Sequence, residues 1–176
     1  MKNLISLGGP QQGVSSFPNC EQVFRENCGH VSLAIEVLKN SWFSQKLVAP
    51  LTYWHETDEN AYRKRNSFLA VINNENEFNA NYVLNLNNLR RLILVKYEND
   101  SAIIPNESTW FGFYDTHKKE FPMEKTRVFQ EDRLGLETLK NSGRLIRLMS
   151  AGSHLELNKN WFSQSILPFL KETAKP

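Results

Sequence analysis

An uninterrupted apolar run occupies Leu92 to Val95, near the middle of the chain. A strand that is apolar on both faces is typical of the interior of a parallel sheet, because helices cover both sides of such a sheet. The run lies within a longer strand-like stretch, Arg91 to Tyr97, and Asn3 to Leu7 and Arg144 to Met149 have the same character. The sequence therefore predicts an α/β protein built on a parallel sheet.

The stretches between and after these strands carry the apolar spacing of amphipathic helices. The markers are the stripe Val31, Ala34, Ile35 and Leu38, the stripe Tyr82, Leu86 and Leu89, the segment Glu131 to Asn141 closed by Gly143, and a last helix from about Trp161 that Pro168 bends or shortens.

Residues 14–90 separate two strands that are expected in one sheet. An ordinary crossover needs only about a dozen residues, so we expect a mainly helical cap insertion at about 14–90 within a single domain, residues 1–176. The span is rich in aromatic side chains, which suit a wall for an apolar substrate. The alternative is that these rings only pack the core of the cap itself.

The overall charge excludes some classes of partner. With 21 basic and 19 acidic side chains the formal charge is +2, which gives no electrostatic reason to expect nucleic acid or an anionic membrane surface. The apolar runs fall far short of the roughly 20 residues that cross a bilayer. We therefore expect no nucleic-acid partner and no stable membrane insertion.

Asp100 and His154 each follow a predicted strand, where functional groups collect in open α/β sheets. Alone, an Asp in this position is more often a turn or helix-capping residue. Together the two follow the chain order of the last two members of a Ser, Asp, His triad in α/β-hydrolases. His30, His55 and His117 lack this placement and are expected to be structural or on the surface.

Cys20 and Cys28 are eight positions apart and have two interpretations. They form a disulfide in an oxidising compartment, or Cys28 with His30 forms a thiol and base pair, which is less favoured because catalytic Cys and His usually meet across the fold. Asn99 and Asn106 begin sequons, which are compatible with glycosylation during secretory passage.

Several blocks of the sequence closely resemble the palmitoyl-protein thioesterase family of lysosomal depalmitoylating enzymes, in order and with matching spacing. They are residues 4–14 (LISLGGPQQGV), Tyr53-Trp54-His55, Phe68-Leu69-Ala70 with Ile72-Asn73, Trp110 to Tyr114, Asp132 to Leu136 and Gly152 to Leu155.

The resemblance implies part of an α/β-hydrolase fold, consisting of the last strands of the sheet, flanking helices and the cap. It implies removal of long-chain acyl groups from cysteine thiols, with Asp100 and His154 as catalytic Asp and His. Cys20 and Cys28 fall where the family has a disulfide.

The resemblance also implies the substrate and its surroundings. The cap forms much of the fatty-acyl groove in this family, and Trp54, Ala102 and Ile103 are the candidates for its lining. The implied partners are S-acylated proteins or peptides and long-chain acyl thioesters. No cofactor and no metal are implied, and the expected localisation is the lysosome or the secretory route.

The chain differs from the family pattern at its N-terminal end. No Gly-x-Ser-x-Gly turn occurs in it, and Ser15 and Ser16 enter the cap rather than a strand-to-helix turn. We therefore expect a C-terminal portion that is inactive as written, with the nucleophile upstream of Met1. Two alternatives stay open: a non-catalytic acyl-binding remnant of the fold, and a lipase or carboxylic esterase, which differs only in its leaving group.

Overall fold

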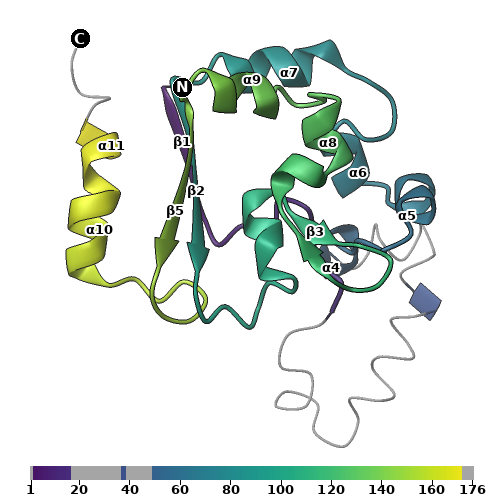
Figure 1. Cartoon of the computed structure of the whole chain (residues 1–176), viewed down its shortest axis with the longest axis horizontal. Helices are drawn as coiled ribbons and strands as arrows, with labels where there is room; N and C mark the ends of the chain where they lie inside the picture. The colour runs from purple at the N-terminus through teal and green to yellow at the C-terminus, as the bar shows by residue number, and fades with distance from the viewer. Residues whose placement is uncertain (1, 17–36, 39–48, 172–176) are drawn as a thin grey trace, which may run out of the picture.

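A three-stranded parallel sheet forms the centre of the computed structural model, which describes residues 2–16, 37–38 and 49–171. The strand order is β1 (Asn3–Leu7), β2 (Arg91–Tyr97), β5 (Leu145–Ser150), with β2 in the middle. The bounds of β1 and β2 match the prediction, and β5 begins one residue later than predicted. The predicted parallel sheet is thus confirmed, with its most apolar strand at the centre (Figure 1).

Short helices and one small hairpin complete the described part of the chain. The α-helices are α4 (Ala49–Thr52), α5 (Glu59–Arg65), α6 (Leu69–Ile72), α7 (Ala80–Asn87), α8 (Arg127–Gln130), α9 (Leu136–Asn141), α10 (Lys159–Ser165) and α11 (Leu167–Lys171). The 3-10 helices are η2 (Asn106–Trp110) and η3 (Met123–Lys125), and the hairpin consists of β3 (Phe113–Tyr114) and β4 (Glu120–Phe121).

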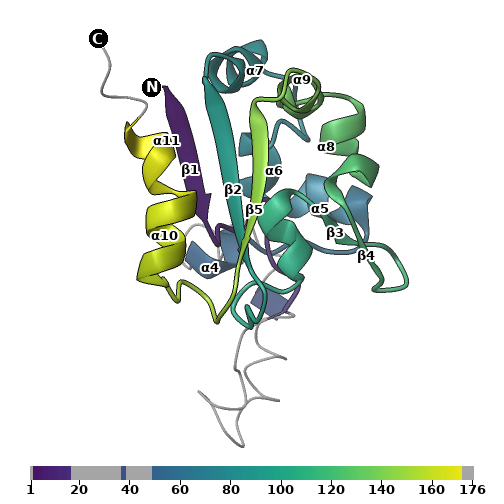
Figure 2. The ribbon, with the colours of Figure 1, turned by 60° about the vertical axis from the view of Figure 1, so that its left-hand side comes forward.

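Successive residues of β2 pack on opposite faces of the sheet, so each face has its own core. Leu92 and Leu94 pack with buried residues of η3, α8 and α9. Ile93, Val95 and Tyr97 pack on the other face, where Ile166 and the aromatic residues of α10 and α11 lie. Figure 2 shows α10 and α11 on one side of the sheet and α8 and α9 on the other.

Two of the predicted helices differ from the structure. The segment Glu131 to Asn141 is helical only from Leu136, because Asp132 (φ 44°) and Gly135 (φ 77°) adopt left-handed backbone conformations that a right-handed helix does not tolerate. The last helix is divided at Ile166 into α10 and α11, with Pro168 in the first turn of α11, where proline is accepted. The predicted stripe beginning at Val31 lies mostly outside the described residues.

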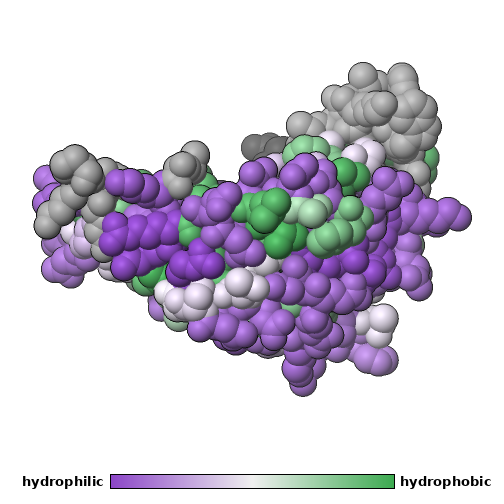
Figure 3. Space-filling view, turned by 90° about the horizontal axis from the view of Figure 1, so that it is seen from above, coloured by the Kyte–Doolittle hydropathy of each residue, from purple (hydrophilic) through white to green (hydrophobic). Residues whose placement is uncertain are grey.

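The surface seen from the side of α7 and α9 is mainly hydrophilic, with hydrophobic side chains gathered near its middle (Figure 3). Leu84 of α7 is among the exposed apolar side chains, with 59% of its surface accessible. Within the described ranges no helix has the length and apolar character needed to cross a bilayer.

Candidate active site

The loops that follow β2 and β5 meet at one edge of the sheet, since parallel strands end on the same side. The backbone N–H of Glu98 donates to the carbonyl of Ser150 (2.9 Å), and that of Asn99 donates to the carbonyl of Gly152 (3.0 Å). These two bonds extend the β2 to β5 pairing beyond the strands. They hold the segment that leads to Asp100 against the segment that leads to His154.

The structure brings Asp100 and His154 into direct contact. The distance from His154 Nδ1 to Asp100 Oδ2 is 2.8 Å. The other carboxylate oxygen, Oδ1, accepts the backbone N–H groups of Ala102 (2.8 Å) and Ile103 (3.0 Å). The Asp100 side chain is fully buried, whereas 29% of the His154 side chain is exposed. A buried carboxylate thus has its hydrogen bonds satisfied and holds an accessible imidazole.

This arrangement fixes the tautomer of the imidazole. A carboxylate accepts a hydrogen bond, so Nδ1 carries the hydrogen and Nε2 is left to take up or release a proton. The negative charge of Asp100 also stabilises the imidazolium that forms when Nε2 gains a proton. The pair is therefore equipped for general base and general acid chemistry at Nε2.

Gly8 and Tyr97 pack beside the imidazole, and the sequence analysis did not single out either of them. A Cβ added at Gly8 would lie 3.1 Å from His154 Cε1 and 3.3 Å from Tyr97 Cε2. The Tyr97 and His154 rings meet edge to face, with centroids 6.4 Å apart. Burial, reinforced by the charge of Asp100, raises the pKa of Tyr97, so its phenol stays neutral beside the pair.

We expect Gly8→Ala to disturb the position of His154. Gly8 has φ +62°, so the added methyl group costs about 1–2 kcal/mol of backbone strain and also presses on the ring. Gly143→Ala is the matched control, because Gly143 has φ +68° with no atom within 4 Å of the added Cβ. In an active form of the protein, Gly8→Ala should lower kcat/KM by about 10²-fold more than Gly143→Ala does. A displacement of a catalytic group by about 1 Å can cost that much in rate. Equal effects of the two changes on kcat/KM would exclude this role for Gly8.

The candidates for the acyl groove lie in different places. Ala102 and Ile103 contribute their N–H groups to Asp100, and the Ile103 side chain is buried. Trp54 forms a bridge with Val14 and lines a pocket of about 580 Å³ whose described lining includes neither Asp100 nor His154.

The remaining predicted sites are the cysteine pair and the two sequons. Cys20 and Cys28 lie outside the described residues. Asn99 is exposed, whereas the Asn106 amide is partly buried and donates to the carbonyl of Tyr97 (2.7 Å). In the described ranges no group of three or more His, Cys, Asp or Glu side chains is arranged to hold a metal ion.

A parallel sheet with helices on both faces, and an Asp–His pair beyond the carboxyl ends of its last two strands, is part of an α/β-hydrolase fold. The sequence model of the family described as palmitoyl protein thioesterase matches residues 1–154. The chain belongs to this family.

Curated relatives carry the same family name. The chain is 39% identical to palmitoyl-protein thioesterase 1 of Caenorhabditis elegans over 95% of its length, and 33% identical to palmitoyl-protein thioesterase 3 of Dictyostelium discoideum over 96%. It is 37% identical to lysosomal thioesterase PPT2 of Bos taurus over 96% of its length. The chain spans 57%, 60% and 56% of the length of these relatives.

Proposed function

We propose that the chain is part of an enzyme that hydrolyses long-chain acyl thioesters, of the palmitoyl type, on protein cysteines. The observation that carries the proposal is the 2.8 Å contact between His154 Nδ1 and the buried carboxylate of Asp100, in a chain that belongs to a thioesterase family. Palmitoylated proteins and peptides are the substrate class that the family name indicates.

In this proposal His154 transfers the protons, and Asp100 holds the His154 ring in position. Nε2 removes the proton of a serine hydroxyl as the oxygen attacks the thioester carbonyl, and it then gives a proton to the departing cysteine thiolate. A water molecule, activated in the same way, releases the fatty acid from the serine. Asp100 stabilises the imidazolium during both steps.

We further propose that the serine and the oxyanion donors come from a protein segment outside these 176 residues. The sequence contains no Gly-x-Ser-x-Gly turn. The length of the relatives that the chain does not cover is compatible with such a segment. On its own the chain is then inactive, since loss of the serine alone costs about 10⁶-fold in kcat.

The remaining features belong to the same proposal. Residues 14–90 form the cap of one hydrolase domain, and Trp54, Ala102 and Ile103 lie along the path of the acyl chain. A disulfide between Cys20 and Cys28 and glycans on Asn99 and Asn106 fit a lysosomal protein, and the relative from Bos taurus is named a lysosomal thioesterase.

Complementation tests the proposal. The chain is produced together with the part of the Caenorhabditis elegans relative that the match does not cover, to give a complemented protein. We expect this protein to hydrolyse a palmitoyl-thioester peptide, and we expect the chain alone and the added segment alone to stay at the background rate, about 10⁶-fold lower. Release of free thiol reports the reaction.

The outcomes separate the alternatives. Hydrolysis by the chain alone would place a nucleophile within it and reject the proposed division. A folded complex that binds the acyl peptide without cleaving it would indicate a non-catalytic acyl-binding protein. Faster hydrolysis of the matching oxygen ester than of the thioester would indicate a carboxylic esterase or lipase.

A further inference from the structure

The loop that carries His154 runs from the end of β5 to the start of α10 (Figure 2). Its first part is held against the end of β2 by the two backbone bonds described above, to the carbonyls of Ser150 and Gly152. Its last part is held by Asn158, which caps α10 by accepting two backbone N–H groups of the first turn. Residues 153–157, which include His154, lie between these two anchors.

Side-chain packing gives this part of the loop little support. A cavity of about 540 Å³ lies where the loop meets α10, and its lining includes Gly152, Glu156 and Trp161. The side chains of Leu155 and Leu157, on either side of Glu156, are each 51% exposed. The course of the backbone at His154 therefore depends mainly on hydrogen bonds within the loop.

The backbone at His154 forms a tight turn. The N–H of Glu156 donates to the carbonyl of Ser153 (3.0 Å), which closes a four-residue turn with His154 at its second position and Leu155 at its third. Leu155 has φ +58°, a left-handed conformation that is unfavourable for a residue with a Cβ. Turns with a positive φ at the third position normally have Gly or Asn there. The residues of this turn do not favour it by themselves, so another interaction must hold it.

The carboxylate of Glu156 supplies that interaction. Its Oε2 accepts the backbone N–H of Ser153 (2.8 Å). Glu156 is thus bonded to Ser153 twice, through its own N–H and through its side chain, and the two bonds fix the peptide groups on both sides of Ser153. A hydrogen bond to a charged acceptor is also stronger than one between neutral groups.

Gly152 leaves room for the carboxylate. A Cβ at this position would lie 2.8 Å from Glu156 Oε2 and 3.0 Å from its Cδ, which is too close for either atom to stay in place. Gly152 also has φ +103°, a conformation that other residues rarely adopt. A side chain at position 152 would push the carboxylate away from the Ser153 N–H.

The alternative is that Glu156 is an ordinary solvated surface residue. Glu156 and Ser153 are both exposed, so water competes for their polar groups and the bond between them contributes little to the stability of the whole fold. Its effect is local, because His154 is the residue directly after Ser153. The ring of His154 reaches Asp100, 2.8 Å away, only from this course of the backbone.

We propose that Glu156 is a positioning residue for His154. Its carboxylate acts as a hydrogen-bond acceptor that closes the turn at residues 153–156 and so directs the imidazole toward Asp100. The effect on catalysis rests on the hydrolysis proposed above, whereas the effect on the position of the ring does not.

The kinetics of the complemented protein give the first test. Glu156→Ala should lower kcat about tenfold, the value of one hydrogen bond to a charged group, with little change in KM. Glu156→Gln keeps an oxygen that can accept the Ser153 N–H, so it should stay within about threefold of the unchanged protein although it has lost the charge. Equal losses in the Ala and Gln variants, or no loss in the Ala variant, would overturn the proposal.

Glu137→Ala is the matched control for these variants. Glu137 is exposed and lies in the first turn of α9. Its replacement removes one surface carboxylate without touching the loop, so kcat should stay within about twofold. A tenfold loss in this control as well would show that kcat responds to surface charge in general and would contradict the role of Glu156.

A change at Leu155 gives an independent test of the turn. Asparagine adopts the left-handed conformation more readily than leucine does, so in Leu155→Asn the turn needs less help to form. In this background Glu156→Ala should lower kcat by about threefold or less, which would show that the two positions are coupled. An undiminished tenfold loss would show that the carboxylate does not act by holding the turn.

NMR of the complemented protein separates a failure of this inference from a failure of the proposed reaction. The hydrogen on His154 Nδ1, which Asp100 accepts, is followed by its proton signal and its rate of exchange with water. Glu156→Ala should shift this signal and speed its exchange, whereas Glu156→Gln and Glu137→Ala should leave it in place. The readout needs no turnover. An identical signal in the unchanged protein and in all three variants would overturn the proposal.

Discussion

His154→Ala should abolish thioesterase activity in the complemented protein, with a loss of about 10⁴ to 10⁶-fold in kcat. The alanine variant has no group at this point to remove the serine proton or to protonate the leaving thiolate. The side chain is 29% exposed and belongs to a loop, so the melting temperature should change little. Thiol release from a palmitoyl-thioester peptide, together with thermal unfolding, measures both quantities.

His117→Ala is the control for this change. His117 is exposed and lies in the turn of the β3–β4 hairpin, so its loss should leave kcat within about twofold. Turnover retained in His154→Ala would remove His154 from the proposed role. A large drop in melting temperature would show that the side chain acts mainly in folding.

Asp100→Asn should lower kcat by about 10⁴-fold while the fold is kept. Asparagine preserves the shape of the side chain and one oxygen that accepts the N–H groups of Ala102 and Ile103. Its amide nitrogen then faces His154 Nδ1 and favours the wrong tautomer, and the negative charge that stabilises the imidazolium is lost. Activity assays should show the fall in kcat with a smaller change in KM.

Asp115→Asn is a close control for Asp100→Asn. Asp115 Oδ1 also accepts two backbone N–H groups, from His117 (2.8 Å) and Lys119 (2.9 Å), but it lies in the hairpin turn. These bonds lower the pKa of Asp115. If both variants had the same modest effect on kcat, Asp100 would be a turn-stabilising residue, which is the alternative that its sequence position allows.

The strands could be predicted closely because their signal is local. Leu92 to Val95 must be covered on both faces, and the structure covers them with two separate cores. The meeting of Asp100 with His154 followed from the same sheet, since parallel neighbours place their following loops at one edge. The start of α9 was missed because the left-handed conformation of Asp132 and Gly135 depends on contacts that no apolar spacing reveals.

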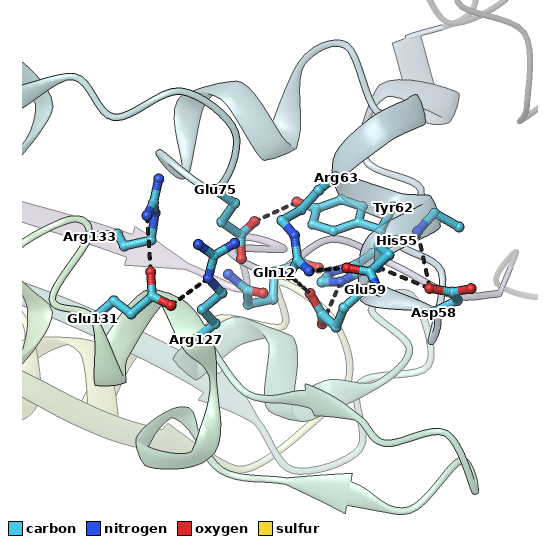
Figure 4. Close-up of polar contacts among 12 residues, drawn as sticks. Gln12, His55, Asp58, Glu59, Tyr62, Arg63, Glu75, Arg127, Glu131 and Arg133 are labelled. Atoms are coloured by element: carbon cyan, nitrogen blue, oxygen red, sulfur yellow. Dashed lines mark hydrogen bonds and ion pairs between the residues drawn. The ribbon is translucent and has the colours of Figure 1, made fainter.

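The buried contacts around His55 could not be predicted from the sequence. They involve Gln12, Glu59, Tyr62 and Glu75, which Figure 4 shows, and Phe113. These residues come from a turn after β1, from α5, from the residues after α6 and from β3, and no spacing rule connects them. His55 was assigned to the structural or surface histidines, and it is buried. Gly8 gave a weak signal as one of two adjacent glycines after a strand, but only the position of the His154 ring gives it a function.

The two N–H groups that donate to Asp100 belong to the main chain. The position of the carboxylate therefore depends on the backbone path of residues 101–103 and not on their side chains. Replacement of the side chain at position 102 or 103 therefore leaves these two hydrogen bonds in place. Proline is the exception, because it has no backbone N–H to donate. The side chains at these positions can thus change without the loss of the two hydrogen bonds that Asp100 accepts.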